Sequence, residues 1–313
     1  MRTCFLFPAQ GAQYPGMARD LWDHSQAVKD LFQIASDATG TDLRRLLFEG
    51  TEEELRATDR TQIAVTLANL SAAIVLGEHG VTGAGFAGFS LGEYSALHLA
   101  GVIGAADIFP IARERGVAME AASRASDTAD GRSGMAAVIG LAPERAEAAI
   151  ADLPEGTIFV ANYSSPRQVV LAGTAGGLRD AEAACKEAGA RRFITLKVSG
   201  PFHSPLIRDA ADRLAEVLSD VPFADPVRPV YANVTGAQVT SGSEARELCV
   251  RQVVSSVRWT DEVAALQAAG YDRYLEVGPG QVLAGLFRGF RGEFRCEAAG
   301  TLEAIAAAAA ASS

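Results

Sequence analysis

The sequence predicts an α/β protein in which a small α+β domain is inserted into a larger domain with a central, mostly parallel sheet. Three observations support this prediction. Short apolar strands alternate with helical segments at both ends of the chain, as is typical of parallel sheets. A Gly-x-Ser-x-Gly turn at Gly88–Gly92 joins a strand to a helix. A polar, glycine- and serine-rich stretch at 123–134 interrupts this pattern, and a second series of strands and helices follows.

The composition is that of a globular enzyme and argues against several other classes of protein. The chain has 313 residues, of which 49% are hydrophobic and 21% charged. A formal net charge of −10 argues against a general nucleic-acid binder. The longest apolar runs are interrupted before they reach the length of a membrane span, and the N-terminus lacks a signal-peptide cleavage site. We therefore expect a cytoplasmic protein that binds neither nucleic acid nor a membrane.

The cysteines give no sign of disulfides or of a metal site. They lie far apart in the sequence, without a Cys-x-x-Cys motif or Cys/His pairing, at Cys4, Cys185, Cys249 and Cys296. We interpret them as reduced structural thiols and expect no bound metal.

The first 80 residues are predicted to form one buried strand and a series of helices. The strand covers 3–8 and runs into a loop at 8–17 that holds two glutamines around a glycine. A solvated loop is the simpler interpretation, but sheet enzymes place ligand-binding groups in loops at the carboxyl ends of strands. Helical patterns follow at 18–39, 42–48, from 51 with a capping-box motif, and 61–79.

The Gly-x-Ser-x-Gly turn lies between a strand predicted over 81–87 and a helix predicted over 93–100. Such a turn places Ser90 on a strained corner above the sheet, with the helix N-terminus behind it. Gly88 and Gly92 leave room for strand and helix to close around this corner. Small residues also cluster in tight turns for packing reasons alone. The strand–turn–helix context nevertheless favours a serine nucleophile, and with it an α/β-hydrolase-like larger domain.

The second series of elements predicts the inserted domain. After a helix over 105–122 and a linker, strands and helices alternate in the order β-α-β-β-α-β, which is the order of a ferredoxin-like unit. The predicted strands are 135–139, 158–162, 168–172 and 192–198, and the helices are 143–151 and 177–188. We therefore assign 133–198 to a small ferredoxin-like domain and 1–132 with 199–313 to the larger domain.

The last third of the chain returns to the larger domain. A Pro-bracketed turn at 199–205 precedes it. The predicted helices are 206–220, 246–254 and 261–269, the strands are 226–233 and 273–277, and an alanine-rich helix or frayed tail begins at 302. A Gly-Pro-Gly turn at 278–280 follows the last predicted strand, and a short helix follows the turn.

A nucleophilic serine needs a base, and the chain offers four histidines. His98 lies eight residues after Ser90 on the same predicted helix, about 12 Å along its axis, and cannot reach back. His79 stands at a helix end and His24 in an exposed-looking helix, where ordinary structural roles suffice. His203 follows a strand in a turn whose backbone Pro and Gly restrict. It is the best candidate, although a hydrogen-bonded structural histidine would fit the same position.

No carboxylate stands out as the third member of a triad. Serine hydrolases with this turn usually carry their Asp and then their His late in the chain. Here a long segment follows His203, and no Asp in a strand-end loop stands out between Ser90 and His203. A Ser–His pair held by something other than a carboxylate suits a transferase, because a transferase must keep water from the acyl-enzyme.

Several separated motifs resemble those of the malonyl-CoA:acyl-carrier-protein transacylases and the acyltransferases of polyketide synthases, along nearly the whole chain. The run Phe-Pro-Ala-Gln-Gly-Ala-Gln at 7–13 resembles the family's Gly-Gln-Gly-Ser-Gln loop, with alanine at two positions. The resemblance implies that Gln10 contributes to the oxyanion hole. The motif at 88–93 resembles the nucleophile motif, which implies Ser90 as nucleophile and the Leu91 N–H as second oxyanion donor.

Four further matches imply the rest of the site. The Arg-Gly-x-x-Met run that begins at Arg115 resembles the family motif whose arginine pairs with the free carboxylate of a malonyl group. Asn162 begins an Asn-x-x-x-Pro-x-Gln stretch similar to the one that lines the family's cleft. The Gly-Pro-Phe-His-Ser run around His203 resembles the catalytic histidine loop. Gln252 resembles the glutamine whose main-chain carbonyl holds that histidine.

The acyl group is inferred from three side chains. A guanidinium at Arg115 offers the bidentate fork that a carboxylate needs, and it would discriminate against neutral acyl groups. A structural ion pair is the alternative role for this arginine. Phe202 resembles the malonyl-selective form, in which a bulky ring fills the space of an α-methyl group. Phe89 replaces the family's usual histidine, which makes the acyl pocket more apolar and leaves an unusual or larger acyl group open.

The resemblance implies a ping-pong transfer of malonyl from the coenzyme A thioester, through Ser90, to the phosphopantetheine thiol of an acyl carrier protein. It implies no bound cofactor, and we expect a monomer. Candidate docking residues for the acidic carrier are Lys186, Arg191, Arg192, Arg208 and Arg288. The residues that depart from the family motifs, Ala9, Ala12 and Phe89, favour polyketide biosynthesis. A malonyl transacylase of fatty-acid synthesis, a serine thioesterase or hydrolase, and a non-catalytic docking protein of a synthase remain as alternatives.

Overall fold

A computed structural model of the chain describes residues 1–290, 292 and 295–311. Its elements in chain order are β1 (Thr3–Phe7), α1 (Arg19–His24), α2 (Gln26–Thr39), α3 (Leu43–Glu49), α4 (Glu52–Arg56), α5 (Thr58–Glu78), β2 (Gly83–Gly88), α6 (Gly92–Leu99), α7 (Ile108–Ala125), β3 (Gly134–Ile139), α8 (Pro143–Ile150), β4 (Ile158–Ser165), β5 (Gln168–Gly173), α9 (Ala175–Glu187), β6 (Arg192–Thr195), η1 (Pro205–Ile207), α10 (Arg208–Ser219), β7 (Tyr231–Ala232), β8 (Ala237–Gln238), α11 (Gly242–Gln252), α12 (Trp259–Ala268), β9 (Arg273–Glu276), α13 (Val282–Phe287), β10 (Cys296–Ala298) and α14 (Leu302–Ala310).

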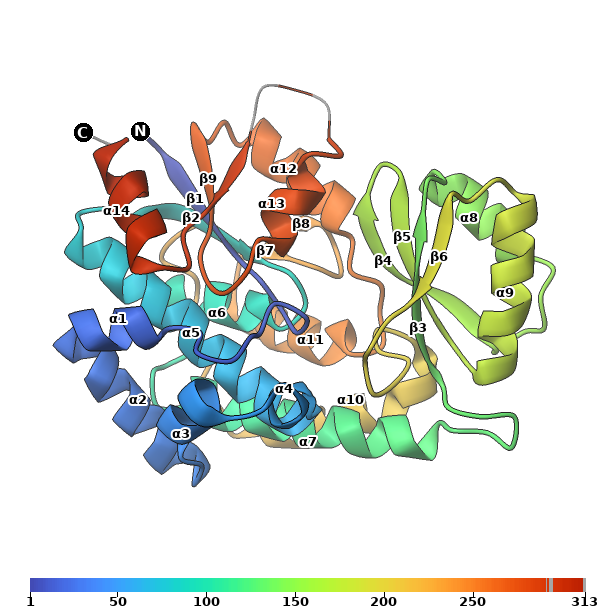
Figure 1. The fold of residues 1–313 in the computed structure, drawn as a ribbon, viewed down its shortest axis with the longest axis horizontal. Coiled ribbons are helices and arrows are strands. Elements are labelled where there is room, and N and C mark those ends of the chain that lie inside the picture. The colour runs from blue at the N-terminus through green and yellow to red at the C-terminus, as the bar shows by residue number, and fades with distance from the viewer. Residues whose placement is uncertain (291, 293–294, 312–313) are drawn as a thin grey trace.

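In the described part of the chain, four parallel strands form the first sheet, in the order β10-β9-β1-β2 (Figure 1). Beyond β2, Val230 adds a parallel bridge to Phe86. Because the strands are parallel, their carboxyl ends meet at one edge of the sheet. The loop after β1 and the turn after β2 therefore lie next to each other at this edge, where the sequence places its candidate catalytic groups.

Both faces of the first sheet are covered, and alternate residues of β1 show how. Phe5 and Phe7 pack into the largest buried cluster, which includes the apolar side chains of α5. Cys4 and Leu6 point to the opposite face and pack into a second cluster with Trp259. This alternation follows from the two-residue repeat of a strand. The uninterrupted apolar run at 3–7 is therefore the signature of a central strand buried on both faces.

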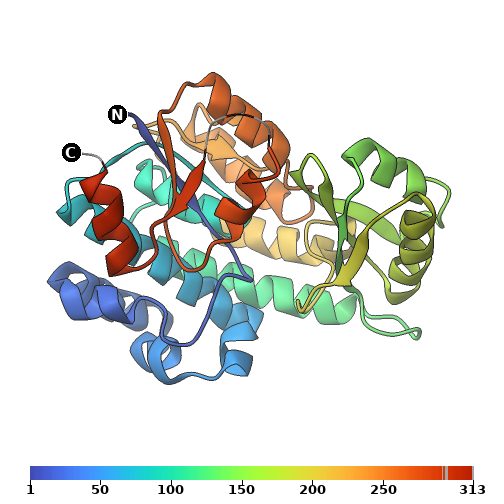
Figure 2. The ribbon, with the colours of Figure 1, turned by 45° about the horizontal axis from the view of Figure 1, so that its top comes forward.

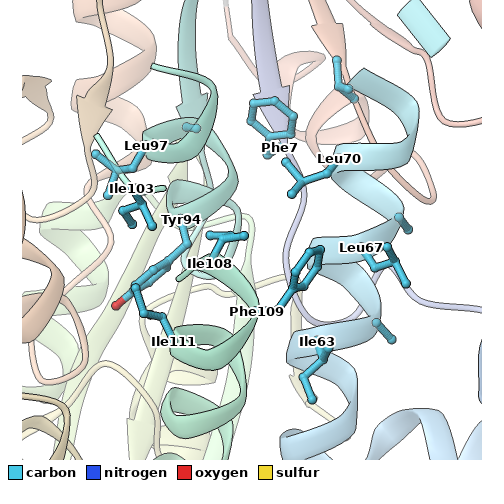
Figure 3. Close-up of a cluster of buried hydrophobic side chains, with 14 of the residues drawn as sticks. Phe7, Ile63, Leu67, Leu70, Tyr94, Leu97, Ile103, Ile108, Phe109 and Ile111 are labelled. Atoms are coloured by element: carbon cyan, nitrogen blue, oxygen red, sulfur yellow. The ribbon is translucent and has the colours of Figure 1, made fainter. Parts of the chain in front are cut away.

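Helix α5 forms the centre of the first cluster. Figure 3 shows Ile63 and Leu67 of α5 beside Phe109 of α7, and Leu70 beside Phe7 of β1. By length and composition alone α5 could cross a membrane, but 83% of its most apolar window is buried inside the protein. That burial is typical of the core helix of a folded domain.

The second sheet is antiparallel and has the order β4-β5-β3-β6. Helices α8 and α9 pack together and against its strands. The elements follow the predicted order β3-α8-β4-β5-α9-β6. Figures 1 and 2 place this sheet and its helices at one end of the molecule, beside the part built on the first sheet.

The two sheets are joined by more than the chain crossings at α7–β3 and β6–η1. The Tyr163 N–H of β4 donates to the Val257 carbonyl at 2.9 Å, and the Val257 N–H donates to the Ala161 carbonyl at 2.8 Å. Val257 lies between α11 and α12 of the larger part. This ladder ties β4 to the segment that follows Gln252.

Some predicted boundaries are wrong. The helix predicted over 18–39 is two helices, because Ser25 adopts an extended backbone and its hydroxyl caps α2 by accepting from Val28. The linker predicted from 123 begins only after α7 ends at Ala125. The strand predicted over 226–233 shrinks to β7, since prolines at 226 and 229 have no N–H for a ladder. Strand β10 was not predicted; it is only three residues long.

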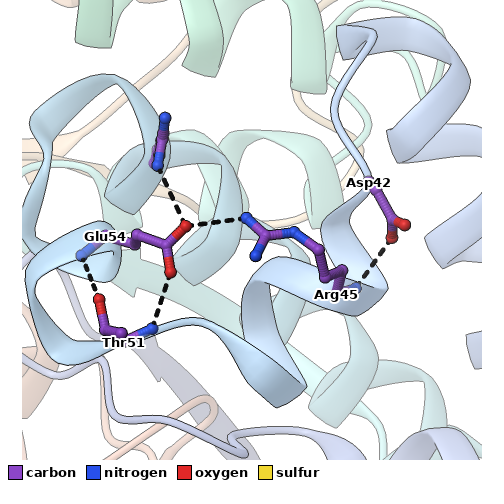
Figure 4. Close-up of polar contacts among 5 residues, drawn as sticks. Asp42, Arg45, Thr51 and Glu54 are labelled. Carbon is purple, nitrogen blue, oxygen red and sulfur yellow. Dashed lines mark hydrogen bonds and ion pairs between the residues drawn. The ribbon is translucent and has the colours of Figure 1, made fainter.

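The capping box at the start of α4 is confirmed (Figure 4). The Thr51 hydroxyl accepts from the Glu54 N–H at 3.1 Å, and the Glu54 carboxylate accepts from the Thr51 N–H at 3.0 Å. Arg45 of α3 donates to the same carboxylate at 2.9 Å. The motif thus fixes where α4 begins and how α3 packs beside it.

Candidate active site

Ser90 occupies the turn between β2 and α6 with φ +50°, in the left-handed region. This conformation costs a non-glycine residue on the order of 1–3 kcal/mol. The flanking glycines are sterically required, as predicted. A Cβ on Gly88 would lie 2.0 Å from the Gly92 carbonyl carbon, and a Cβ on Gly92 would lie 2.0 Å from the Phe7 carbonyl oxygen. The strand, the turn and the loop after β1 are therefore packed backbone against backbone.

His203 faces this serine. Its Nε2 lies 2.7 Å from Ser90 Oγ, and its Nδ1 lies 2.9 Å from the Gln252 carbonyl oxygen. Because a carbonyl only accepts, Nδ1 carries the proton and Nε2 is left to accept one from Ser90. Burial first, and then the Arg115 charge, lower the pKa of His203 to about 4. The ring is therefore neutral at neutral pH and able to accept a proton, and it is held by a carbonyl rather than by a carboxylate.

Arg115 of α7 reaches the same point from the other side and is only 1% exposed. Its guanidinium donates to Gln62 Oε1 at 2.8 Å, to Gln252 Oε1 at 3.0 Å and to Ser90 Oγ at 3.2 Å. Arg115 Nε is buried without a hydrogen-bond partner. Within the described residues Arg115 forms no ion pair with an Asp or Glu. A buried cation whose hydrogen bonds go to two amide oxygens and a hydroxyl retains its affinity for an anion.

Gln252 connects His203, Arg115 and Ser90. Its main-chain carbonyl holds His203, while its side-chain oxygen accepts from Arg115. Its Nε2 donates to the Ser90 carbonyl at 3.1 Å and to Glu93 Oε2 at 2.7 Å. These acceptors fix which end of the amide faces Arg115. The residue is fully buried at the end of α11.

The two predicted oxyanion groups lie at the same edge of the sheet. Leu91 follows Ser90 directly, at the N-cap of α6. Gln10 is half-buried in the loop after β1, and this loop is held against the turn by the Phe89 N–H, which donates to the Phe7 carbonyl at 3.0 Å. Their function as an oxyanion hole stays a prediction.

The predicted acyl-pocket residues occupy different surroundings. Phe89 is half-buried, and its ring centroid lies 5.6 Å from that of Trp259. Phe202 is buried in the large cluster. Asn162 is buried on β4, and its Oδ1 lacks a hydrogen-bond partner. Their contact with an acyl group stays a prediction.

Sequence reasoning missed four polar residues that surround the site. They are all almost fully buried: Gln62, Glu93, Asn233 and Glu262. Two had a usable signal. Gln62 is a polar residue in the apolar helix α5, and Asn233 directly follows β7 at the strand-end position where functional groups gather. Burial raises the pKa of Glu93 to about 7, so this acid supplies only part of a negative charge near Arg115.

No group of three or more His, Cys, Asp or Glu side chains in the described residues could hold a metal ion. The cysteines are free thiols. The chemistry available here is therefore that of a serine, a neutral histidine, backbone donors and a buried guanidinium.

Residues 4–305 match the acyl transferase domain family. The chain belongs to this family. The match includes Ser90, His203, Arg115 and Gln252, so the whole geometry described above lies inside it. The chain is an acyltransferase.

Similar proteins agree over almost the full length. The malonyl CoA-acyl carrier protein transacylase of Bacillus subtilis (strain 168) is 38% identical over 289 residues, which is 92% of this chain and 90% of that protein. The protein of the same name from Escherichia coli (strain K12) is 41% identical over 284 residues, 90% of each chain. A solved malonyl-transacylase in complex with a type II PKS acyl-carrier protein superimposes with a TM-score of 0.93 at 36% identity, covering 99% of this chain and 100% of that one.

Proposed function

We propose that this acyltransferase moves a malonyl group from coenzyme A to the phosphopantetheine thiol of an acyl carrier protein, through an acyl-enzyme on Ser90. One observation carries the proposal. The buried Arg115 guanidinium, which has no Asp or Glu ion pair in the described part of the chain, lies 3.2 Å from Ser90 Oγ, and that oxygen lies 2.7 Å from His203. A thioester that bears a free carboxylate is the substrate that uses nucleophile, base and cation together.

In the first half-reaction His203 Nε2 takes the Ser90 proton as Oγ attacks the thioester carbonyl. The Leu91 N–H and the Gln10 side chain stabilise the oxyanion. The intermediate collapses, the C–S bond breaks, and His203 gives the proton to the departing coenzyme A thiolate. Malonyl remains as an ester on Ser90. Coenzyme A acts as a substrate, and no bound cofactor is needed.

In the second half-reaction the carrier thiol takes the place of coenzyme A. His203 removes the thiol proton, the sulfur attacks the ester carbonyl, and the C–O bond to Ser90 breaks. The proton on His203 then returns to Ser90 Oγ, which restores the free enzyme. Because Gln252 offers His203 a neutral carbonyl, nothing in this cycle requires a charged triad acid.

The acyl group is set by Arg115 together with the side chains near Ser90. Arg115 favours a malonyl-type carboxylate, and the bulky Phe202 ring occupies the space of an α-methyl group. Phe89 and Asn162 complete the acyl pocket in this proposal. A larger acyl group remains the alternative, since Phe89 replaces the family's usual histidine.

An acyl carrier protein is the proposed partner. The solved complex noted above pairs a malonyl-transacylase with the carrier protein of a polyketide synthase, while the two bacterial relatives carry the general transacylase name. We favour polyketide synthesis, with fatty-acid synthesis as the alternative. Of the docking candidates, Lys186 is the weakest, because it lies on α9 at the far end of the molecule and pairs with Glu182.

The domain assignment also belongs to this proposal. We assign 1–132 and 199–313 to an α/β-hydrolase-like domain and 133–198 to a ferredoxin-like domain. The strand order β4-β5-β3-β6 with two helices supports the second label. The protein is proposed to act as a cytoplasmic monomer.

The deciding experiment exposes the protein to a mixture of acyl-CoAs and then measures the mass of Ser90 peptides. Malonyl on Ser90, with free coenzyme A released in a stoichiometric burst, is the expected result. Adding a phosphopantetheinylated carrier should discharge the ester. Sustained release of coenzyme A without a carrier would instead identify a hydrolase, and no mass shift would identify a non-catalytic protein.

A further inference from the structure

Asn233 is fully buried immediately after β7 and bonds to both sides of the nucleophile turn. Its Oδ1 accepts from the Ser90 N–H at 2.6 Å, and its Nδ2 donates to the Gly88 carbonyl at 2.7 Å. A backbone N–H only donates and a carbonyl only accepts, so these two partners fix the orientation of the amide. One side chain thus bridges the backbone on either side of residue 89.

Asn233 is itself held by neighbours on other elements. Its Nδ2 also donates to Glu262 Oε2 of α12 at 2.7 Å. Its backbone N–H donates to Glu93 Oε2 of α6 at 2.8 Å, and its carbonyl accepts from the Arg258 N–H at 2.8 Å. These bonds leave the amide little freedom to rotate or to swing away from the turn.

We propose that Asn233 is a positioning residue that holds the strained turn so that Ser90 Oγ faces His203. Ser90 has φ +50°, and a strained backbone persists only when its surroundings over-determine it. Glycine contacts at 88 and 92 restrict the turn sterically, but they do not fix the Ser90 N–H. Asn233 supplies that missing constraint. The inference rests on the proposed function, in which Ser90 is the nucleophile.

Glu262 completes the arrangement. Burial, and then the neighbouring Glu93, raise the pKa of Glu262 well above its usual range, which favours the uncharged form of a carboxyl behind the serine. A charged carboxylate there would oppose the oxyanion that develops during acylation. Its side-chain hydrogen bond within the described residues is the one that Oε2 accepts from Asn233 Nδ2, since Glu262 Oε1 has no partner among them.

The test compares Asn233→Ala with Leu266→Ala, a core substitution on the same helix as Glu262 whose apolar side chain makes no hydrogen bond to Ser90, His203 or Asn233. Both should lower the melting temperature. Only Asn233→Ala should lower kcat of malonyl transfer, by about 100-fold, with KM for malonyl-CoA within about threefold of wild type, because a small displacement of a nucleophile has effects of this order. Labelling of Ser90 by a fluorophosphonate should slow in parallel.

A second pair of variants serves if Asn233→Ala fails to fold. Glu262→Leu removes one acceptor of Asn233 Nδ2 and should lower kcat by about 10-fold. Glu262→Gln keeps an amide oxygen at that place and should restore most of the loss. If Glu262 had only a structural role, Glu262→Gln and Glu262→Leu would have the same kcat whenever their melting temperatures are equal.

The outcomes separate the two proposals. If wild-type Ser90 reacts with the fluorophosphonate but is not acylated by malonyl-CoA, the proposed function fails, and labelling rates still test Asn233. If Asn233→Ala labels as fast as wild type, or if Leu266→Ala loses as much kcat, the positioning role is overturned.

Discussion

His203 Nε2 lies 2.7 Å from Ser90 Oγ, although the two residues are 113 positions apart and both have a left-handed backbone, with φ +58° and +50°. Each residue is locked by its own set of bonds. The His203 N–H and ring bind the carbonyls of Val253 and Gln252, and the Ser90 N–H binds Asn233. Two strained turns thus meet at one hydrogen bond, and Gln252 ties them together, because its carbonyl accepts from His203 and its Nε2 donates to the Ser90 carbonyl. The protein's own hydrogen bonds therefore preorganise the Ser90–His203 pair, which is the condition for efficient proton transfer.

The low pKa of His203 predicts an unusually acid-resistant acylation step. The base is active when neutral and is lost as pH falls through its pKa of about 4, far below the ordinary value of 6.5. We therefore expect kcat/KM for malonyl-CoA to stay nearly constant from pH 7 to about 5 and to fall by half near 4. A stopped-flow pH profile checks this, with circular dichroism to show that the protein remains folded. A half-loss near 6.5 would contradict a buried, carbonyl-held base.

The charge of Arg115 contributes to this low pKa, which gives a related prediction. Arg115→Gln removes the positive charge, so the pKa of His203 should rise. The loss of reactivity at low pH should then begin at a higher pH than in wild type. Malonyl binding would weaken in this variant, so the rate of fluorophosphonate labelling is the appropriate readout. Arg115→Lys keeps the charge, so its labelling rate should fall at nearly the same pH as that of wild type. If the labelling rate falls at the same pH in all three proteins, the charge of Arg115 does not lower the pKa of His203.

Arg115 should also set the preference for a carboxylated acyl group. We expect Arg115→Ala to lower kcat/KM for malonyl-CoA by about 100-fold or more, because the substrate carboxylate would lose a buried guanidinium partner. Acetyl-CoA should be used equally well or better. Arg124→Ala is the matched control on the same helix, since its side chain is 78% exposed and pairs only with Glu120 among the described residues. Unchanged malonyl transfer in Arg115→Ala would show that Arg115 does not bind the substrate carboxylate.

Gln252 contacts the site through both its main chain and its side chain, and a substitution tests the side chain alone. In Gln252→Ala the carbonyl that holds His203 remains, but Arg115 loses one acceptor and Glu93 loses a donor. We expect malonyl-CoA acylation to fall by about 10-fold while fluorophosphonate labelling changes much less, in line with one lost hydrogen bond to a charged group. Arg251→Ala, an exposed neighbour, is the control. Equal losses in both assays would mean that the side chain supports the base itself.

The extent to which the sequence predicted this site depends on how local each signal is. Ser90 and its glycines lie in one motif, so their geometry could be derived from the five residues of Gly88–Gly92 and steric limits. His203, Arg115 and Gln252 were found through separate motifs and a family resemblance, because residues so far apart meet only in the folded chain. Asn233 and Glu262 have no motif, and their bonds depend on where β7 and α12 dock. Residues whose contacts form only when distant elements pack together were therefore not predicted from the sequence.

The same limit applies to the helical and strand boundaries. The 18–39 pattern is periodic enough for one helix, but the Ser25 hydroxyl competes as a cap and divides it. Strand β10 has three residues and gains its ladder only from β9. In contrast, β1 and α5 were predicted closely, because burial on all sides leaves a strong apolar signature in the sequence.

Phe89 gives the last prediction, because its ring packs on Trp259, with centroids 5.6 Å apart, beside the nucleophile. Trp259 is fully buried, and its Nε1 has no hydrogen-bond partner. Phe89→Ala should lower the free energy of unfolding by about 2 kcal/mol, less than for a fully buried ring because Phe89 is half-buried. Phe89→His keeps most of the ring volume against Trp259, so it should be more stable than Phe89→Ala in urea unfolding. Both variants should keep the Arg115-dependent preference for malonyl-CoA over acetyl-CoA within about threefold of wild type, since the carboxylate contact is untouched. A preference lost in Phe89→Ala and regained in Phe89→His would instead show that residue 89 itself selects the acyl group.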